Sequence, residues 1–366
     1  MERKVLMTPG PATTSRGVKE AQVVPDICPR EEEFGRVMED IREKLIRIAG
    51  GDENYECVLM GGPGTAGMEA TLSSVVNGKV LIINNGAYGE RFVKIAKCYN
   101  MDFKEVVFGW DEEINPEKVE AEIDEGVKYI VMIHHETTTG ILNPVEKISE
   151  LAKKHNCVFI LDAISSFAGL PIDVKKLNVD FLISSSNKCI QGMPGICFII
   201  CKKEELVKLK EVPKRGFYLN MYLEHEYVKL KKQTRFTPPV QTAYALKKAI
   251  EEFFEEGAEK RYGRYQENNK ILLEGMAKLG FKKIFPDHFE ESGLLTTFFD
   301  PDNKNYSFDK MHDGLYKRGF TIYPGKIKEK TFRLSNLGDL NIEDIKKFIE
   351  ELKKVMKEMD LELISA

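Results

Sequence analysis

Apolar residues along the first two thirds of the chain gather in short runs, and amphipathic segments separate most of these runs. The runs are rich in β-branched residues and fit strands that are buried on both faces: residues 56–60, 79–84, 129–135, 157–162, 180–186 and 195–201. Segments such as 116–126 and 144–156 between them have apolar residues at helical spacing. This alternation predicts β-α-β units and a largely parallel sheet covered by helices. Because 195–201 follows 180–186 closely, we expect these two strands to pair antiparallel.

The pattern changes after about residue 240, where a long helical stretch covers residues 242–280. Gly257 lies within this stretch and is expected to break the helix. Shorter strand-like and helical segments follow: residues 293–299, 307–319, 320–324, 331–336 and 341–359. We therefore predict a large domain over residues 15–245 and a smaller α+β domain over 246–366. Residues 1–14 are expected to pack near an active site in the cleft between them.

The composition argues against several classes of protein. Hydrophobic residues make up 42% and charged residues 31%, which is ordinary for a soluble globular protein. The net charge of −4 gives no reason to expect nucleic acid or an anionic membrane as a partner. The N-terminus has no apolar stretch typical of a signal peptide, and no apolar run approaches membrane length. Seven cysteines without a CxxC pair indicate reduced thiols, so we expect a cytoplasmic protein.

The segment GGPGTAG, at residues 61–67, follows an apolar run and opens a helical one. Gly62, Gly64 and Gly67 fit the G-x-G-x-x-G pattern of dinucleotide-binding proteins. The next strand, however, ends in asparagine and glycine at 84–86 and lacks the acid that would hold a ribose. No Lys-Ser/Thr pair follows, so the P-loop pattern also fails. Bare amides at a helix N-terminus bind phosphate, and we predict a phosphate cup here, with a plain tight turn as the alternative.

Two charged residues stand just after apolar runs. Asp162 ends one run, where it could cap a following turn or, at the carboxyl end of a strand, keep a pyridine nitrogen protonated. Lys188 follows another run, and a lysine in such a place is usually solvated. Hydroxyl and amide residues precede it, however, and a glycine-rich stretch follows. A lysine desolvated in a cleft is a usable nucleophile toward aldehydes.

Three further segments carry candidate residues. In HHETTTG, at residues 134–140, the adjacent histidines would point to opposite faces of a strand, so no metal site is expected. The threonines of this segment suit polar contact with a ring oxygen. Tyr88 could be a core aromatic or could stack on a flat ring. Arg333 lies in a strand-like run, and its planar fork matches a carboxylate.

Together these segments resemble the class V aminotransferases of fold type I over nearly the whole chain. The resemblance is carried by residues 6–11, 23–35, 81–92, 134–143, 185–195, 235–242, 320–326 and 332–339. It implies pyridoxal 5′-phosphate as cofactor and a mostly parallel seven-stranded sheet. The more specific segments PDICPRE, HHETTTG and RFTPPVQT imply transfer of the amino group of 2-aminoethylphosphonate to pyruvate, giving phosphonoacetaldehyde and L-alanine. Alternatives are alanine–glyoxylate or serine–pyruvate transamination, a nicotinamide dehydrogenase, and a non-catalytic protein that binds the cofactor.

The resemblance also implies roles for the matching residues around the cofactor. Lys188 would form the covalent imine with the cofactor and carry the proton, and Asp162 would pair with the ring nitrogen. Other contacts are implied for Tyr88 on the ring face, for Thr137 at the ring hydroxyl, and for Gly64, Thr65 and Asn187 at the phosphate. Pro63 departs from the family pattern, in which a serine is expected, and it offers the phosphate neither a hydroxyl nor an N–H.

Two further implications concern the subunits and the substrates. Thr237, in RFTPPVQT, would reach the phosphate of a neighbouring subunit's cofactor, which implies a homodimer with shared active sites. Arg333 would bind the carboxylate of pyruvate or alanine and would also serve the phosphonate. Weaker candidates for the phosphonate oxygens are Arg30 and the turn that contains Thr8 and Gly10.

Overall fold

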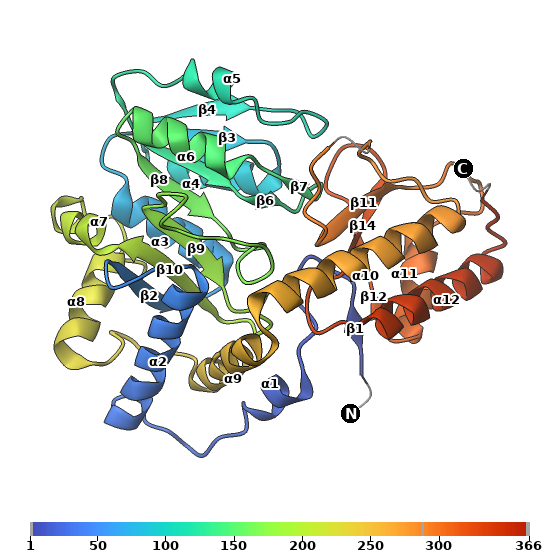
Figure 1. The fold of residues 1–366 in the computed structure, drawn as a ribbon, viewed down its shortest axis with the longest axis horizontal. Coiled ribbons are helices and arrows are strands. Elements are labelled where there is room, and N and C mark those ends of the chain that lie inside the picture. Colours follow the sequence, from blue (N-terminus) through green and yellow to red (C-terminus); the bar gives the residue numbers. More distant parts are fainter. Residues whose placement is uncertain (1–2, 287–288, 364–366) are drawn as a thin grey trace.

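The computed structural model describes residues 3–286 and 289–363. It has a large α/β part and a smaller α+β part beside it (Figure 1). Within the described residues, none of the helices combines the length and the apolar composition that a membrane crossing needs.

A seven-stranded sheet forms the centre of the large part. Its strands are β2 (Tyr55–Gly61), β3 (Lys79–Asn84), β4 (Phe103–Val107), β5 (Val127–Ile133), β8 (Val158–Asp162), β9 (Phe181–Ser185) and β10 (Ile196–Lys202). They lie in the order β2-β10-β9-β8-β5-β3-β4. All neighbours pair parallel except β10, which is antiparallel to both β9 and β2. The predicted mostly parallel seven-stranded sheet and the antiparallel strand within it are confirmed.

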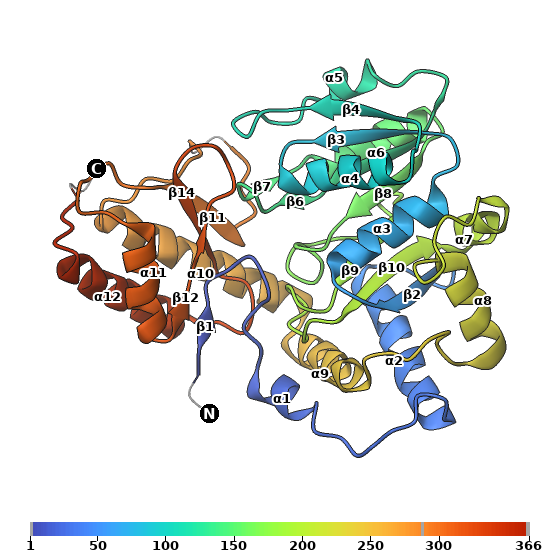
Figure 2. The same cartoon turned by 180° about the vertical axis from the view of Figure 1, so that it is seen from behind.

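Helices cover both faces of this sheet (Figure 1, Figure 2). One face packs on α2 (Glu32–Ile48), α5 (Pro116–Glu120), α6 (Val145–Lys154) and α9 (Val240–Glu256). The other packs on α3 (Gly64–Val75), α4 (Ala87–Cys98), α7 (Lys203–Lys208) with the following 3-10 turn (Leu209–Glu211), and α8 (Met221–Lys231). Along β3, Leu81 and Ile83 face the first layer while Val80 and Ile82 face the second. Both faces are apolar because both are buried, which explains the unbroken apolar runs in the sequence.

The smaller part combines three helices with short strands. The helices are α10 (Ala258–Lys278), α11 (Phe308–Lys317) and α12 (Ile342–Glu358). An antiparallel sheet has the order β11-β14-β13, formed by β11 (Leu295–Phe299), β14 (Thr331–Ser335) and β13 (Tyr323–Pro324). The N-terminal strand β1 (Val5–Leu6) pairs in parallel with β12 (Phe320–Thr321) and so joins this part. Short elements elsewhere are α1 (Arg16–Glu20), β6 (His135–Glu136) and β7 (Ile141–Leu142).

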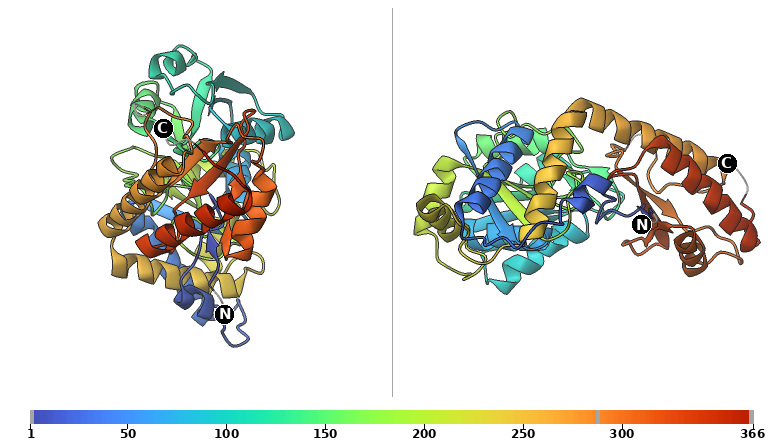
Figure 3. Two further views of the ribbon diagram at one scale, coloured as in Figure 1. Left: turned by 90° about the vertical axis from the view of Figure 1, so that its right-hand side faces the viewer. Right: turned by 90° about the horizontal axis from the view of Figure 1, so that it is seen from below.

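Gly257 separates the two long helices at the junction of the parts. It has a φ of 84°, which favours glycine, and it ends α9 and precedes α10. Phe253, one turn earlier, still packs in the core of the large part, whereas Leu272 packs in that of the small part. Figure 3 shows α10 extending from the large part across to the small one. The boundary expected between residues 245 and 246 falls inside α9, and we propose Gly257 as the point of division.

Candidate active site

The predicted site residues of the large part lie where parallel strands end, at what we call the carboxyl edge of the sheet. Five strands end there. Asp162 is the last residue of β8, and the others are followed by such residues: β2 by Gly64 and Thr65, β3 by Tyr88, β5 by Thr137, and β9 by Asn187 and Lys188. The carboxyl ends of parallel strands share one edge, so residues that are more than a hundred positions apart in sequence come together.

Lys188 is partly buried beneath the N-terminal segment. Its Nζ donates a hydrogen bond to the backbone carbonyl of Pro9. Gly10 has a φ of 139°, and a Cβ at this position would collide with the lysine ammonium. Burial lowers the pKa of Lys188 from its ordinary value. The turn of Thr8 and Gly10 therefore covers the lysine, and a side chain at position 10 would displace it.

Asp162 ends β8 and is 3% exposed. Its Oδ1 accepts a hydrogen bond of 2.8 Å from the backbone N–H of Ile164. Its Oδ2 is buried and meets no hydrogen-bond partner among the described residues. Burial raises the pKa of this carboxyl to about 7. A buried carboxylate oxygen without a partner is costly, and a cationic N–H group of a ligand would satisfy it.

The phosphate cup is formed where β2 passes into α3. Pro63 occupies the N-cap position and α3 begins at Gly64, so the missing N–H of the proline costs this helix no internal bond. The hydroxyl of Thr65 accepts a 3.0 Å hydrogen bond from Arg91 Nη1. Asn187 faces the same edge from β9, and its side-chain oxygen accepts a 3.0 Å bond from Ser185. The cup thus combines free helix amides with an arginine.

Arg91 was not among the residues that the sequence suggested. It lies on α4, three residues after Tyr88, and its guanidinium is 4.6 Å from the centre of the Tyr88 ring. That spacing puts both side chains on one face of a helix and was the signal that could have found it.

Glu136 is a second buried residue that sequence reasoning did not single out. It is completely buried, and its Oε2 accepts from the backbone N–H groups of Tyr88 (3.2 Å) and Gly89 (3.3 Å). Its Oε1 accepts from the N–H (2.9 Å) and the hydroxyl (2.7 Å) of Thr138. Glu136 therefore anchors the first turn of α4, which carries Tyr88.

Arg333 comes from β14 of the small part and reaches the large part. It is 3% exposed; its Nε donates to the carbonyl of Pro324 at 3.0 Å and its Nη1 to that of Thr137 at 2.9 Å. The Thr137 hydroxyl is buried and has no hydrogen-bond partner among the described residues. Burial lowers the pKa of Arg333, yet no carboxylate of the described chain lies within 4.0 Å of it. A buried guanidinium without an anion is suited to bind one.

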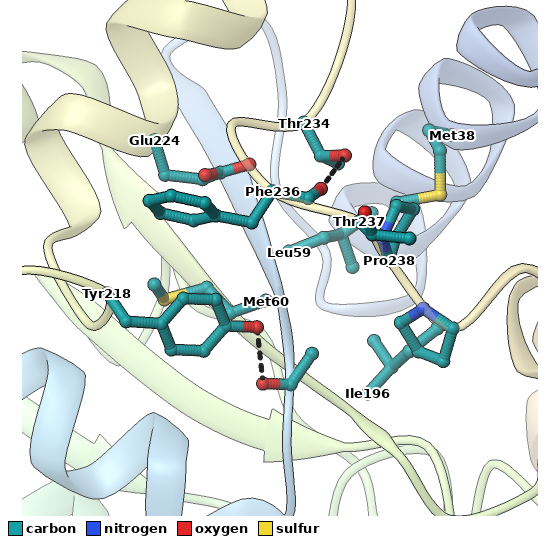
Figure 4. A pocket seen from close by; sticks show the side chains of 12 residues that line it. Met38, Leu59, Met60, Ile196, Tyr218, Glu224, Thr234, Phe236, Thr237 and Pro238 are labelled. Atoms are coloured by element: carbon teal, nitrogen blue, oxygen red, sulfur yellow. Dashed lines mark hydrogen bonds between the residues drawn. The ribbon is translucent and has the colours of Figure 1, made fainter. Parts of the chain in front are cut away.

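Two predicted residues lie apart from Lys188 and Arg333 within the chain. Arg30 donates to the backbone carbonyls of Thr234 and, at 3.2 Å, of Arg235. Thr237 follows on the same segment and lines a small hollow (Figure 4). The hollow is lined by Met38, Leu59, Met60, Gly61, Ile196, Tyr218, Glu224, Thr234, Phe236, Thr237, Pro238 and Pro239. Arg30 thus holds the segment of Thr237, and no described contact joins it to Arg333.

Comparison with known proteins decides the family. The sequence matches the family described as Aminotransferase class-V over residues 19–310. The chain is a class-V aminotransferase. It is 41% identical to the 2-aminoethylphosphonate–pyruvate transaminase of Phocaeicola vulgatus, over 98% of this chain and 100% of that one. It is 40% identical to the protein of the same name from Vibrio vulnificus strain CMCP6, over 96% of this chain and 97% of that one.

Solved structures show the same fold. The alanine–glyoxylate aminotransferase of Nostoc sp. has a TM-score of 0.90 and 25% identity, over 97% of this chain and 96% of that one. The pyridoxamine–pyruvate aminotransferase of Mesorhizobium loti has a TM-score of 0.89 and 21% identity, over 99% of this chain and 94% of that one. The predicted fold and enzyme class are confirmed, which sets aside the dehydrogenase alternative.

The cofactor of this class-V aminotransferase is pyridoxal phosphate, as predicted. The side chains and backbone of the candidate site fit pyridoxal phosphate at three points. The orphaned Oδ2 of Asp162 suits a protonated pyridine nitrogen, the free amides of the cup suit a phosphate, and the amine of Lys188 suits an aldehyde. Each fit concerns a group whose hydrogen bonds or charge the described chain leaves unsatisfied.

Proposed function

We propose that this aminotransferase transfers the amino group of 2-aminoethylphosphonate to pyruvate and forms phosphonoacetaldehyde and L-alanine. The observation that carries this proposal is the near-complete coverage at about 40% identity by relatives that bear this activity in their names. Alanine–glyoxylate transamination is the second candidate, because a solved structure of that name is 25% identical.

In this proposal Lys188 and Asp162 do the chemical work. The bound cofactor supplies an electron sink for the negative charge that develops at the substrate carbon bearing the amino group. Lys188 would hold the cofactor covalently through its amine and, once displaced by the amino group of the substrate, would take the proton from that carbon. Its lowered pKa favours the neutral amine that this proton transfer requires.

Asp162 holds a proton at the ring nitrogen in this proposal. Its Oδ2 would accept the hydrogen bond from that nitrogen, while Oδ1 keeps its bond to Ile164. A positive partner favours the carboxylate form and so offsets the burial that raises the pKa of Asp162 to about 7.

The remaining large-part residues would orient the cofactor. Gly64, Thr65 and Asn187 would hold its phosphate, with the positive charge of Arg91 beside Thr65. Tyr88 would stack on the ring, and the unpartnered hydroxyl of Thr137 would meet the ring oxygen. These contacts position the cofactor without taking part in proton transfer.

We also propose a homodimer in which Thr237 reaches the cofactor phosphate of the neighbouring subunit. Phe217 is 78% exposed and Tyr218 41% exposed, and both rings lie against Phe236, next to Thr237. Exposed aromatic side chains that cluster in this way are typical of protein interfaces. Arg30 would then hold the shared segment by its bonds to residues 234 and 235.

Arg333 would bind the anionic end of both substrates. The two substrates would occupy the site in turn. The carboxylate of pyruvate is bonded to the reacting carbon and the phosphonate of 2-aminoethylphosphonate lies one carbon further away, so the proposal requires one cation to serve both positions. We propose that the reaction takes place in the cytoplasm, consistent with the seven free cysteines.

A direct assay tests the assignment. Purified enzyme loaded with pyridoxal phosphate is incubated with 2-aminoethylphosphonate and pyruvate, and alanine and phosphonoacetaldehyde are measured. Parallel reactions use alanine with glyoxylate and serine with pyruvate. We expect the phosphonate pair to have the highest kcat/KM. If the loaded enzyme forms alanine with serine as amino donor but none with 2-aminoethylphosphonate, the assignment to the family stands and the proposed substrate is wrong.

A further inference from the structure

Four basic side chains act on Tyr88 at the carboxyl edge. Arg91 and Lys326 lie over its ring, at 4.6 Å and 4.7 Å from the ring centre. Burial alone would raise the pKa of Tyr88, but the positive charges of Lys188, Lys326 and Arg91, together with the Thr137 side chain, outweigh it and the pKa falls. Arg333 lies close enough to Tyr88 for the two to interact electrostatically.

None of these four cations has a carboxylate within 4.0 Å among residues 3–286 and 289–363. The chain as a whole carries 58 acidic and 54 basic residues, so acidic groups are not scarce. Unpaired positive charge gathered at one place in a net negative protein indicates that the site binds anions.

The cations divide between two anionic molecules. Arg91 bonds to Thr65 in the phosphate cup, and Lys188 serves the cofactor aldehyde, so both belong to the cofactor. Arg333 and Lys326 remain for the substrate. Two nitrogens of Arg333 are occupied by backbone carbonyls, and no described partner is bound to Nη2.

Lys326 is placed by the same hairpin that carries Arg333. β13 pairs with β14 so that Tyr323 lies opposite Arg333, and Gly325 then donates a 2.7 Å bond to the carbonyl of Thr331. A Cβ at position 325 would collide with the Thr331 side chain, so glycine is needed where the chain passes this close. From this point Lys326 extends to the Tyr88 ring of the large part.

Resting on the proposed function, we propose that Lys326 is the specificity-determining residue that recognises the second negative charge of a phosphonate substrate. Arg333 binds the first negative charge, which phosphonate and carboxylate groups both carry. A phosphonate has three acceptor oxygens and up to two negative charges, whereas a carboxylate has two oxygens and one charge. A planar guanidinium pairs well with two oxygens, and a lysine ammonium acts as a mobile point charge. Lys326 therefore strengthens binding of the dianion with little effect on the monoanion.

Equilibrium binding to the loaded enzyme tests this division. The probes are ethylphosphonate and propionate, which carry the two anionic groups but no amine. Lys326→Met keeps most of the length of the side chain and removes its charge. Lys328→Met removes an exposed charge from the same hairpin and is the matched control. We expect Lys326→Met to weaken ethylphosphonate binding about tenfold, as for a lost hydrogen bond to a charged group, and propionate binding less than twofold. Lys326→Arg should restore most of the loss, and Lys328→Met should change neither affinity.

Kinetics of the separate half-reactions give the second measurement. With Lys326→Met, the KM for 2-aminoethylphosphonate should rise about tenfold while the KM for L-alanine stays within twofold. Equal weakening of both probes, or of neither, overturns the role of Lys326. If the wild type fails to transaminate 2-aminoethylphosphonate, the proposed function fails, and the ethylphosphonate titration still decides the role of Lys326.

Discussion

The two sides of the candidate site are built in different ways. In the large part, Asp162 ends one strand and Lys188 follows another strand of a seven-stranded sheet that is buried on both faces. In the small part, Arg333 and Lys326 belong to a hairpin whose outer strand, β13, has two residues and is exposed. In the proposed function, the first side supplies the groups for bond making and proton transfer. The second meets it through hydrogen bonds such as those from Arg333 to Thr137 and from Thr297 to Thr139, and its cations are suited to bind an anionic substrate.

The largest effect is expected at Lys188. Lys188→Ala should lower turnover roughly 10⁴-fold, because the group that would bind the cofactor and move the proton is removed. Borohydride reduction of loaded wild type should leave a pyridoxyl label on the peptide that contains residue 188. The control is Lys328→Ala, which should keep both activity and label. A label on any other peptide would contradict the assignment of Lys188 as the residue that binds the cofactor covalently.

Asp162→Asn tests whether the orphaned carboxylate is kept for the cofactor. The neutral amide should lower turnover roughly 10²- to 10³-fold, because it stabilises a protonated ring nitrogen less well. Without cofactor, the same change should raise the melting temperature at pH 8. Thermal denaturation of cofactor-free wild type and variant between pH 4 and pH 8 measures the difference.

The sign of that stability change follows from the pKa. Burial raises the pKa of Asp162 from 3.8 to about 7. Between these values the folded chain holds a proton that the unfolded chain has released, so its stability falls as pH rises. Above about pH 7 the penalty is complete, on the order of a few kcal/mol, and it disappears below pH 4. A variant no more stable than wild type at pH 8 would contradict this account.

Glu136→Gln is the matched control for that experiment. Both carboxylates are buried, but Glu136 already accepts four hydrogen bonds. An amide nitrogen would face donors in place of one oxygen, so we expect this variant to be less stable by about 1–3 kcal/mol. If both variants were more stable than wild type, the gain at Asp162 could not be attributed to its unpartnered carboxylate oxygen.

Arg333→Met tests the recognition side. It should raise the KM of both 2-aminoethylphosphonate and pyruvate about 10- to 100-fold, because each loses a charge-assisted hydrogen bond. Its effect on kcat should be smaller than that of Lys188→Ala. Steady-state kinetics with each substrate varied in turn would check this. Unchanged KM values for both substrates would mean that Arg333 binds neither of them.

The smallest effect is expected at Thr237, which lies outside both sides of the site within one chain. Thr237→Val keeps the shape and removes the hydroxyl, so cofactor affinity should fall about fivefold. Fluorescence titration with pyridoxal phosphate measures the affinity, and light scattering measures the mass. A monomer with unchanged affinity would mean that this residue serves no neighbouring subunit.

The sequence was informative about residues at the ends of strands. It was much less informative about contacts between residues that are distant along the chain. Asp162, Lys188 and the cup were predicted because apolar runs and glycines mark strand ends and turns locally. Glu136 was not singled out, since its bonds from the amides of Tyr88 and Gly89 depend on how β6 packs against α4. Arg30 was expected at the substrate, but its side chain bonds to the backbone at residues 234 and 235.

By itself, the sequence determined the alternation of strands and helices, the break at Gly257 and the residue types at each strand end. Only the tertiary structure decided the strand order, the orphaned oxygen of Asp162, the anchoring of Tyr88 and the meeting of Arg333 and Lys326 with the large part. The reason is physical: periodicity reports which side of an element is buried, whereas desolvation and charge act between residues that are close in space and distant along the chain.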